Sequence, residues 1–182
     1  GVCLKRRRTL TLRRRERPPI GSMAPFPQPS VWDWAPHAPE RAALVVAVGA
    51  DVLAIGADVS RRSDIATLVE QTVRHFGRLD VLVTNSGGPK PGLFGAMTES
   101  DWRDAIDLVL MSTVLLSMEA VPHMRRAGGG RIINITSISA KQPIAGLMLS
   151  NALRPAVTGF SKTLASELAR DNILVNCVAP GY

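Results

Sequence analysis

Three side chains in the C-terminal half have the types and spacing of a reaction site: Ser137, Ser150 and Arg154. Ser137 closes the apolar run 131–136, and the other two lie four residues apart in a predicted helix, 147–169. This spacing places Ser150 and Arg154 on one helical face. A serine hydroxyl can orient a substrate oxygen, and a guanidinium can stabilise an oxyanion or hold a phosphate. Arginine stays protonated, so it cannot relay a proton.

The same three residues also have structural interpretations. Ser137 could cap its strand, Ser150 could cap the helix that follows, and Arg154 could be a solvated surface charge. The residue types alone leave both interpretations open, so the elements that position these side chains decide between them.

From about residue 40 onward, predicted strands and helices alternate. The predicted strands are 52–57, 79–84, 131–137 and 173–179, and the predicted helices are 63–76, 98–126 and 147–169. Gly77 ends the first of these helices, Thr98-Glu99-Ser100-Asp101 is a capping box, and 40–48 is typical of the end of an earlier helix. This order predicts an α/β fold with a parallel sheet flanked by helices on both faces.

Residues suited to ligand contact follow each predicted strand. They are Asp58, Asn85–Gly88, Ser137 and Pro180-Gly181. Ligands of parallel sheets bind beyond the carboxyl ends of the strands, so we expect these residues to line one edge.

Residues 40–182 resemble the short-chain dehydrogenase/reductase superfamily, entered part-way through. The motifs that carry the resemblance are Ala57-Asp58-Val59-Ser60, Asn85-Ser86-Gly87-Gly88, the strand 130–137 and Val175-Asn176-Cys177-Val178-Ala179-Pro180-Gly181. They are most similar to a subgroup resembling 3-oxoacyl-[acyl-carrier-protein] reductase that lacks the standard Tyr/Lys pair. The resemblance implies a truncated Rossmann-like domain. It also implies hydride transfer between NAD or NADP and a small carbonyl or alcohol substrate.

The resemblance also implies roles for single residues. Ser137, Ser150 and Arg154 occupy the catalytic positions. The cofactor contacts fall on Asp58, Val59, Asn85, Gly87, Pro180 and Gly181. Homo-oligomers would form through the helices 99–126 and 147–169. No metal site is expected, because the histidines and cysteines lack metal-ligand spacing.

The chain departs from the family pattern at the residues that move protons. Ser150 stands where the family has its Tyr acid, Arg154 where it has Lys, and Val109 where it has the tetrad Asn. The glycine-rich diphosphate turn is also missing, since Gly49 and Gly56 do not fit its spacing. Two hypotheses follow. The chain is an NAD(P)-dependent oxidoreductase with impaired catalysis, or it is a catalytically silent interaction module.

The missing first strand of the family leaves the predicted strand 79–84 with an open apolar edge. Such an edge is an aggregation hazard. One repair would be for the strand 52–57 to slide inward and pair with 79–84.

Residues 1–39 differ in composition from the rest of the chain. They hold eight Lys or Arg, two acids and seven of the thirteen prolines, a net charge of +6, whereas residues 40–182 carry fourteen Lys or Arg and thirteen acids, a net charge of +1. We predict a disordered tail, for which nucleic-acid binding is a minor alternative. With no apolar run near the ~18 residues of a membrane span, we expect a cytoplasmic protein without a membrane segment.

Overall fold

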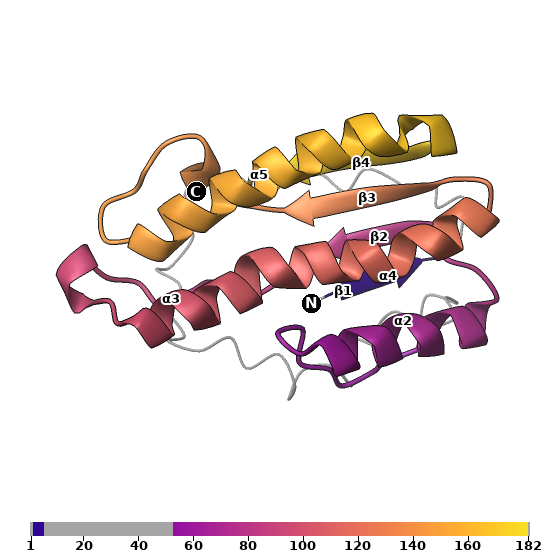
Figure 1. The fold of residues 1–182 in the computed structure, drawn as a ribbon, viewed down its shortest axis with the longest axis horizontal. Coiled ribbons are helices and arrows are strands. Elements are labelled where there is room, and N and C mark those ends of the chain that lie inside the picture. The colour runs from indigo at the N-terminus through magenta and orange to yellow at the C-terminus, as the bar shows by residue number, and fades with distance from the viewer. Residues whose placement is uncertain (1, 6–52, 182) are drawn as a thin grey trace, which may run out of the picture.

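The computed structural model describes residues 2–5 and 53–181 (Figure 1). Its long elements are β1 Val2–Lys5, α2 Arg62–Phe76, β2 Val81–Thr84, α3 Glu99–Ala105, α4 Ser112–Arg126, β3 Gly130–Ile135, α5 Met148–Leu168 and β4 Ile173–Val178. A π-helix, Ile106–Met111, joins α3 to α4, and short 3-10 helices cover Phe94–Ala96, Ile138–Ala140 and Ala169–Asp171. The predicted helix at 40–48 lies outside the described residues.

The sheet has four strands in the order β1-β2-β3-β4. β2, β3 and β4 run parallel, and their register places Leu82 opposite Ile132 and Ile132 opposite Val175. Helices connect the parallel strands, with α4 between β2 and β3 and α5 between β3 and β4. The predicted α/β class and parallel sheet are therefore confirmed.

The segment that pairs with the edge of β2 is not the predicted strand 52–57. Val2–Lys5 lies antiparallel to β2, with Cys3 opposite Val83. Residues 53–57 form no strand, so the prediction of a strand at 52–57 that slides inward was wrong for the described part of that range. β1 already occupies the hydrogen-bonding edge that this strand would need. The expectation of a tail without structure does not hold for Val2–Lys5, and the rest of 1–39 lies outside the described residues.

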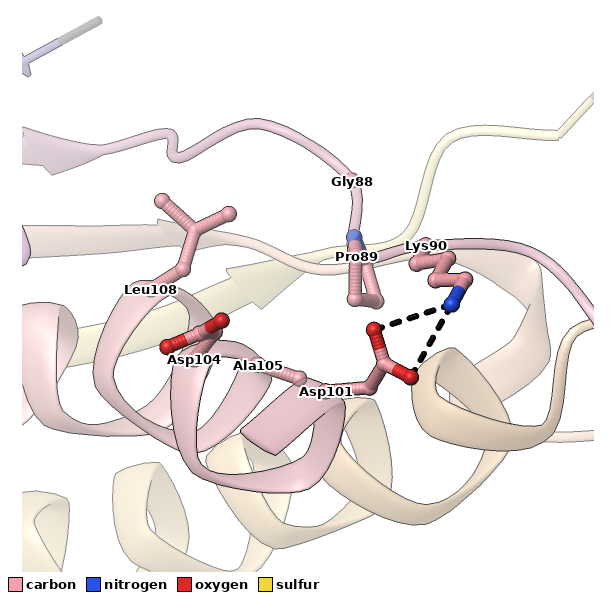
Figure 2. A pocket seen from close by; sticks show the side chains of 7 residues that line it. All are labelled: Gly88, Pro89, Lys90, Asp101, Asp104, Ala105 and Leu108. Carbon is pink, nitrogen blue, oxygen red and sulfur yellow. Dashed lines mark hydrogen bonds and ion pairs between the residues drawn. The ribbon is translucent and has the colours of Figure 1, made fainter. Parts of the chain in front are cut away.

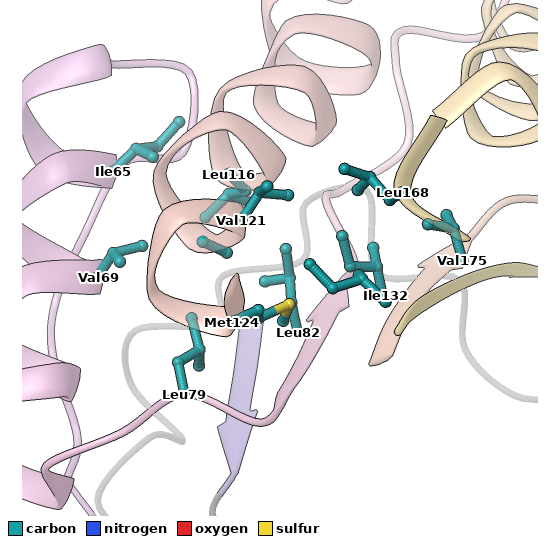
Figure 3. Packing of buried hydrophobic residues seen from close by; sticks show 12 residues of the cluster. Ile65, Val69, Leu79, Leu82, Leu116, Val121, Met124, Ile132, Leu168 and Val175 are labelled. Atoms are coloured by element: carbon teal, nitrogen blue, oxygen red, sulfur yellow. The ribbon is translucent and has the colours of Figure 1, made fainter. Parts of the chain in front are cut away.

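One face of the sheet carries the main hydrophobic core (Figure 3). Leu82, Ile132 and Val175, which sit side by side in the sheet, all point into it. The helices contribute Ile65 and Val69 from α2, Leu116, Ala120, Val121 and Met124 from α4, and Leu168 from α5. Because successive side chains of a strand alternate between faces, these contacts place all three helices on the same face.

The second face has no long helix on it among the described residues (Figure 1). The pattern along β4 is an alternation in which Ile173 and Val175 are buried while Leu174 and Val178 are each 47% exposed. Within residues 53–181, the prediction of helices on both faces is therefore confirmed for one face only. The helices expected for the other face do not fall within the described ranges.

Local sequence signals set the helix ends. Gly77 adopts the left-handed conformation, with φ of 76°, and its N–H bonds the carbonyl of Val73, which ends α2. Thr98 and Asp101 form the predicted capping box of α3.

The continuous helical stretch Glu99–Arg126 is long and apolar enough to span a membrane by length and composition, since an 18-residue window within it has a mean hydropathy of 1.6. It is not an uninterrupted apolar run, because Asp107 and Glu119 fall within it, so the expectation that no such run approaches 18 residues is not contradicted. Leu116, Ala120 and Met124 of the stretch are buried against the sheet, which is the usual place of an apolar helix in a core.

Candidate active site

Backbone hydrogen bonds join the carboxyl ends of β3 and β4, and the Arg154 side chain links them to the loop after β2. The N–H of Thr136 donates to the carbonyl of Val178 at 2.8 Å, and the N–H of Ile138 donates to the carbonyl of Pro180 at 3.1 Å. Arg154 of α5 reaches the carbonyls of Ile135 and Gly87. The residues after β2, β3 and β4 therefore lie at one edge of the sheet, whereas the placement of Asp58 at that edge stays a prediction.

Ser137 comes two residues after the end of β3, whereas the prediction made it the last residue of that strand, and its hydroxyl has a structural partner. The Oγ accepts a hydrogen bond of 3.2 Å from the N–H of Ser139 and so caps the 3-10 helix Ile138–Ala140. The hydroxyl hydrogen is not used in this bond. Ser137 can therefore cap the turn and still donate to a substrate oxygen.

Ser150 lies inside α5 rather than at its cap, because the helix begins at Met148 and its N-cap is Leu147. Its Oγ is 3.0 Å from the Oγ of Ser139. Ser139 is only 2% exposed, and sequence reasoning missed it. Its place two residues after Ser137, in the turn that leaves the strand, was the available signal.

Arg154 is buried, with 7% of its surface exposed, so it is not a solvated surface charge. Nη1 donates to the carbonyl of Ile135 at 3.0 Å, and Nη2 approaches the carbonyl of Gly87 at 3.4 Å. Burial lowers the pKa of this guanidinium.

A π-helix occupies the segment in which the resemblance placed the tetrad asparagine. Val109 lies in it and is 1% exposed, packed with Leu149, Leu153 and Val157 of α5. Single π-turns inside α-helices are rare and occur often at functional sites. The backbone distortion is present here, but an apolar side chain fills the position that would hold a proton-relaying water.

A buried polar chain fixes the sheet to α5 beneath this site. Asn134 of β3 is fully buried, accepts from the hydroxyl of Thr84 at 2.8 Å and donates to the hydroxyl of Ser161 at 2.8 Å. Satisfied buried networks of this kind define one packing arrangement. The strand ends and the helix that carries Ser150 and Arg154 are thereby held in register.

Asp58 and Val59 precede α2 and are held by local contacts. The Asp58 carboxylate accepts from the N–H and hydroxyl of Ser60 at 2.9 and 2.7 Å and lies 3.4 Å from Arg61. The hydrogen bonds from Ser60 lower the pKa of Asp58. Within the described part of the chain, no hydrogen bond or ion pair connects Asp58 or Val59 to the strand-end residues.

A shallow pocket opens beside the strand-end loop (Figure 2). It is lined by Gly88, Pro89 and Lys90 from the loop and by Asp101, Asp104, Ala105 and Leu108 from the helix below. Lys90 Nζ lies 3.0 Å from both carboxylate oxygens of Asp101, so the loop after β2 is tied to the start of α3.

Acid is expected to weaken this tie. The N–H of Thr98, with Lys90 and the Thr98 hydroxyl, lowers the pKa of Asp101 to about 2. A depressed folded-state pKa means that the stabilisation is present above the unfolded-state pKa of about 3.8 and is lost as pH falls toward 2. We expect the Tm difference between the unmodified chain and Asp101→Asn to shrink between pH 4 and pH 2. Thermal unfolding measured across pH 2–6 checks this.

Asp104→Asn is the matched control, because it removes a carboxylate from the same pocket but no bond of the cap. A Tm difference for Asp101→Asn that stays constant from pH 6 to pH 2 would contradict the assignment.

Comparison with known proteins places this geometry in a family. The sequence profile of the short chain dehydrogenase family matches residues 33–182. The chain belongs to the short-chain dehydrogenases. It is 36% identical over 140 residues to the 3-oxoacyl-[acyl-carrier-protein] reductase of Synechocystis sp., a match that covers 77% of this chain and 57% of that protein.

Solved structures of short-chain dehydrogenases share the fold. The L-sorbose reductase of Gluconobacter frateurii, solved with NADPH and L-sorbose, matches with a TM-score of 0.77 and 36% identity, over 81% of this chain and 56% of that one. The acetoin dehydrogenase of Enterobacter cloacae matches with the same TM-score and identity, over 82% and 60%. The chain thus spans less than two thirds of the length of these short-chain dehydrogenases.

The described residues fit a nicotinamide dinucleotide in part. The loop Asn85–Gly88 offers exposed backbone, and a Cβ added at Gly87 or Gly88 would meet no atom within 4 Å, so a ligand can approach it closely. No glycine-rich diphosphate turn is found in the sequence. Among residues 2–5 and 53–181 no group of three or more His, Cys, Asp or Glu could hold a metal ion.

Proposed function

We propose that the chain is the substrate-facing part of an NAD(P)-dependent oxidoreductase that acts on a small carbonyl or alcohol compound in the cytoplasm. One observation carries the proposal: Ser137, Ser150 and Arg154 gather at the carboxyl ends of β2 and β3 through Ser139 and two backbone carbonyls. The names of the relatives, which are reductases and dehydrogenases, support the reaction class.

Each residue of the site has a stated task in this proposal. Ser137 donates its hydroxyl hydrogen to the substrate oxygen and orients it. Arg154 supplies fixed positive charge where negative charge develops on that oxygen. Asp58, Val59, Asn85, Gly87, Pro180 and Gly181 would hold the dinucleotide, whose nicotinamide supplies hydride transfer when it is bound.

Proton donation is the weak step of this site. Neither serine has a pKa near neutrality, and the guanidinium keeps its proton. The Ser139–Ser150 hydroxyl pair is a short hydrogen-bonded link between the turn after β3 and α5. We therefore infer slow turnover limited by protonation of the substrate oxygen.

A second candidate is a catalytically silent module that associates through helices. Val109 in the apolar cluster and the structural bonds of Ser137 and Arg154 favour it, because each of these side chains already has a packing or capping partner. In this reading the helical stretches 99–126 and 147–169 form a homo-oligomer. Met118, on α4, is 55% exposed and would contribute to that surface.

Ser137→Ala tests the enzymatic proposal. We expect NADPH or NADH oxidation with a carbonyl panel to fall by about 10²-fold or more, as for the loss of one oxyanion donor. The matched control is Ser166→Ala, which removes an exposed hydroxyl from α5 and should leave turnover unchanged.

Thermal shift with NAD(H) and NADP(H) on both variants separates lost chemistry from lost binding. Unchanged turnover in Ser137→Ala would remove Ser137 from the mechanism. Stabilisation by neither dinucleotide, in any of the proteins, would favour the silent module.

A further inference from the structure

Arg154 carries an unbalanced charge in the interior of the site. Among the described residues, its Nε is the one buried side-chain nitrogen or oxygen without a hydrogen-bond partner. No ion pair of Arg154 is present among residues 2–5 and 53–181, and its two partners are neutral backbone carbonyls. Burying a charge without an opposite charge beside it costs free energy. The buried polar side chain of Asn134, by contrast, has hydrogen-bond partners for both its oxygen and its nitrogen.

The pattern of bonds leaves one buried edge of the guanidinium short of hydrogen-bond partners. Nη1 is anchored at 3.0 Å on the carbonyl of Ile135, at the end of β3. Nε has no partner, and Nη2 has only the long contact of 3.4 Å to the carbonyl of Gly87. Nε and Nη2 form the side-on edge of the guanidinium, which is the edge that pairs with two oxygens of a carboxylate or phosphate.

The exposed loop that contains Gly87 meets this edge through the 3.4 Å contact between Nη2 and the Gly87 carbonyl. The loop Asn85–Gly88 carries two adjacent glycines with open space around their α-carbons. An incoming oxyanion would replace a long bond to a neutral carbonyl with two charge-assisted bonds. Ser150 lies one helical turn before Arg154 on the same face of α5, and its hydroxyl is 3.0 Å from that of Ser139.

We propose that the Nε/Nη2 edge of Arg154 is the receptor for an oxyanion group, a carboxylate or a phosphate, of the ligand that enters the strand-end site. The inference rests on the proposed function for the claim that a ligand enters there. It adds that the ligand is an anion that presents two oxygens to the guanidinium edge. Its source is either an acidic substrate or a phosphate group of a nucleotide.

Titration with inorganic phosphate and with acetate, at constant ionic strength, tests the receptor without turnover. We expect the Tm of the unmodified chain to rise with each anion and to reach a plateau. Arg154→Met should abolish this rise. Arg170→Gln, which removes an exposed arginine beyond the end of α5, is the matched control and should respond like the unmodified chain. Saturation at lower phosphate than acetate assigns the edge to a phosphate group, and the reverse order assigns it to a substrate carboxylate.

Arg154→Lys is a second variant that keeps the test usable if Arg154→Met does not fold. It keeps the charge but lacks the two-donor edge, so the concentration of half-saturation should rise by about tenfold or more, the loss of one charge-assisted hydrogen bond. Equal responses of the unmodified chain, Arg154→Lys and Arg154→Met to both anions would overturn the proposal. Because no cofactor or turnover enters this measurement, a chain without oxidoreductase activity could still pass it, and an active one could fail it.

Discussion

Replacing Ser150 by Tyr and Arg154 by Lys together is expected to raise NAD(P)H-dependent carbonyl reduction by about 10²-fold or more, the contribution of a positioned general acid. A phenol with a pKa of about 10 is lowered by an adjacent ammonium, whereas a serine hydroxyl cannot be brought near neutrality. Both residues lie on one face of α5, one turn apart, with Ser150 directed at Ser139 and Arg154 at the end of β3. Steady-state NADPH oxidation with a carbonyl panel measures the effect.

The matched control is Ser150→Phe with Arg154→Lys, which has the same ring and the same lysine but no phenol hydroxyl. Its rate should not exceed that of the unmodified chain. Val109 still fills the π-helix position in both variants, so the gain should stay below that of a site with a complete tetrad. Equal rates for the Tyr and Phe variants would show that proton donation does not limit this chain.

Local signals in the sequence were sufficient for most of the elements. The capping box at Thr98 and the glycine at 77 fix helix ends by bonds within a few residues, so composition and spacing reveal them. The strand ends after β2, β3 and β4 were also predictable, because helical connections force parallel strands to end on the same side.

The partner of the open sheet edge could not be predicted. Residues 53–57 are apolar enough for a strand, but a strand needs a free edge, and Val2–Lys5 occupies the one beside β2. Pairing across more than seventy residues leaves no periodicity to detect in either segment. The same holds for the burial of Arg154, since helical spacing gives its face but not the carbonyls of Gly87 and Ile135 that receive it.

Ile132→Ala is expected to lower the free energy of unfolding by about 2–5 kcal/mol, the range for truncating a fully buried side chain. Ile132 is 0% exposed and stands between Leu82 and Val175 in the row of strand residues that faces α4 (Figure 3). Its removal leaves a cavity where the sheet meets the helices, and the strands on either side cannot close it without breaking their ladder. Urea unfolding followed by circular dichroism measures the change.

Leu93→Ala is the matched control, because Leu93 is 70% exposed and its truncation should alter the free energy of unfolding by no more than about 0.5 kcal/mol. An effect of Ile132→Ala as small as that of Leu93→Ala would mean that β3 is not the central strand of a packed sheet. The strand ends would then have no rigid support, and the site built on Ser137 and Arg154 would lose its physical basis. A loss within the expected range would instead tie the positions of those side chains to a cooperatively folded core.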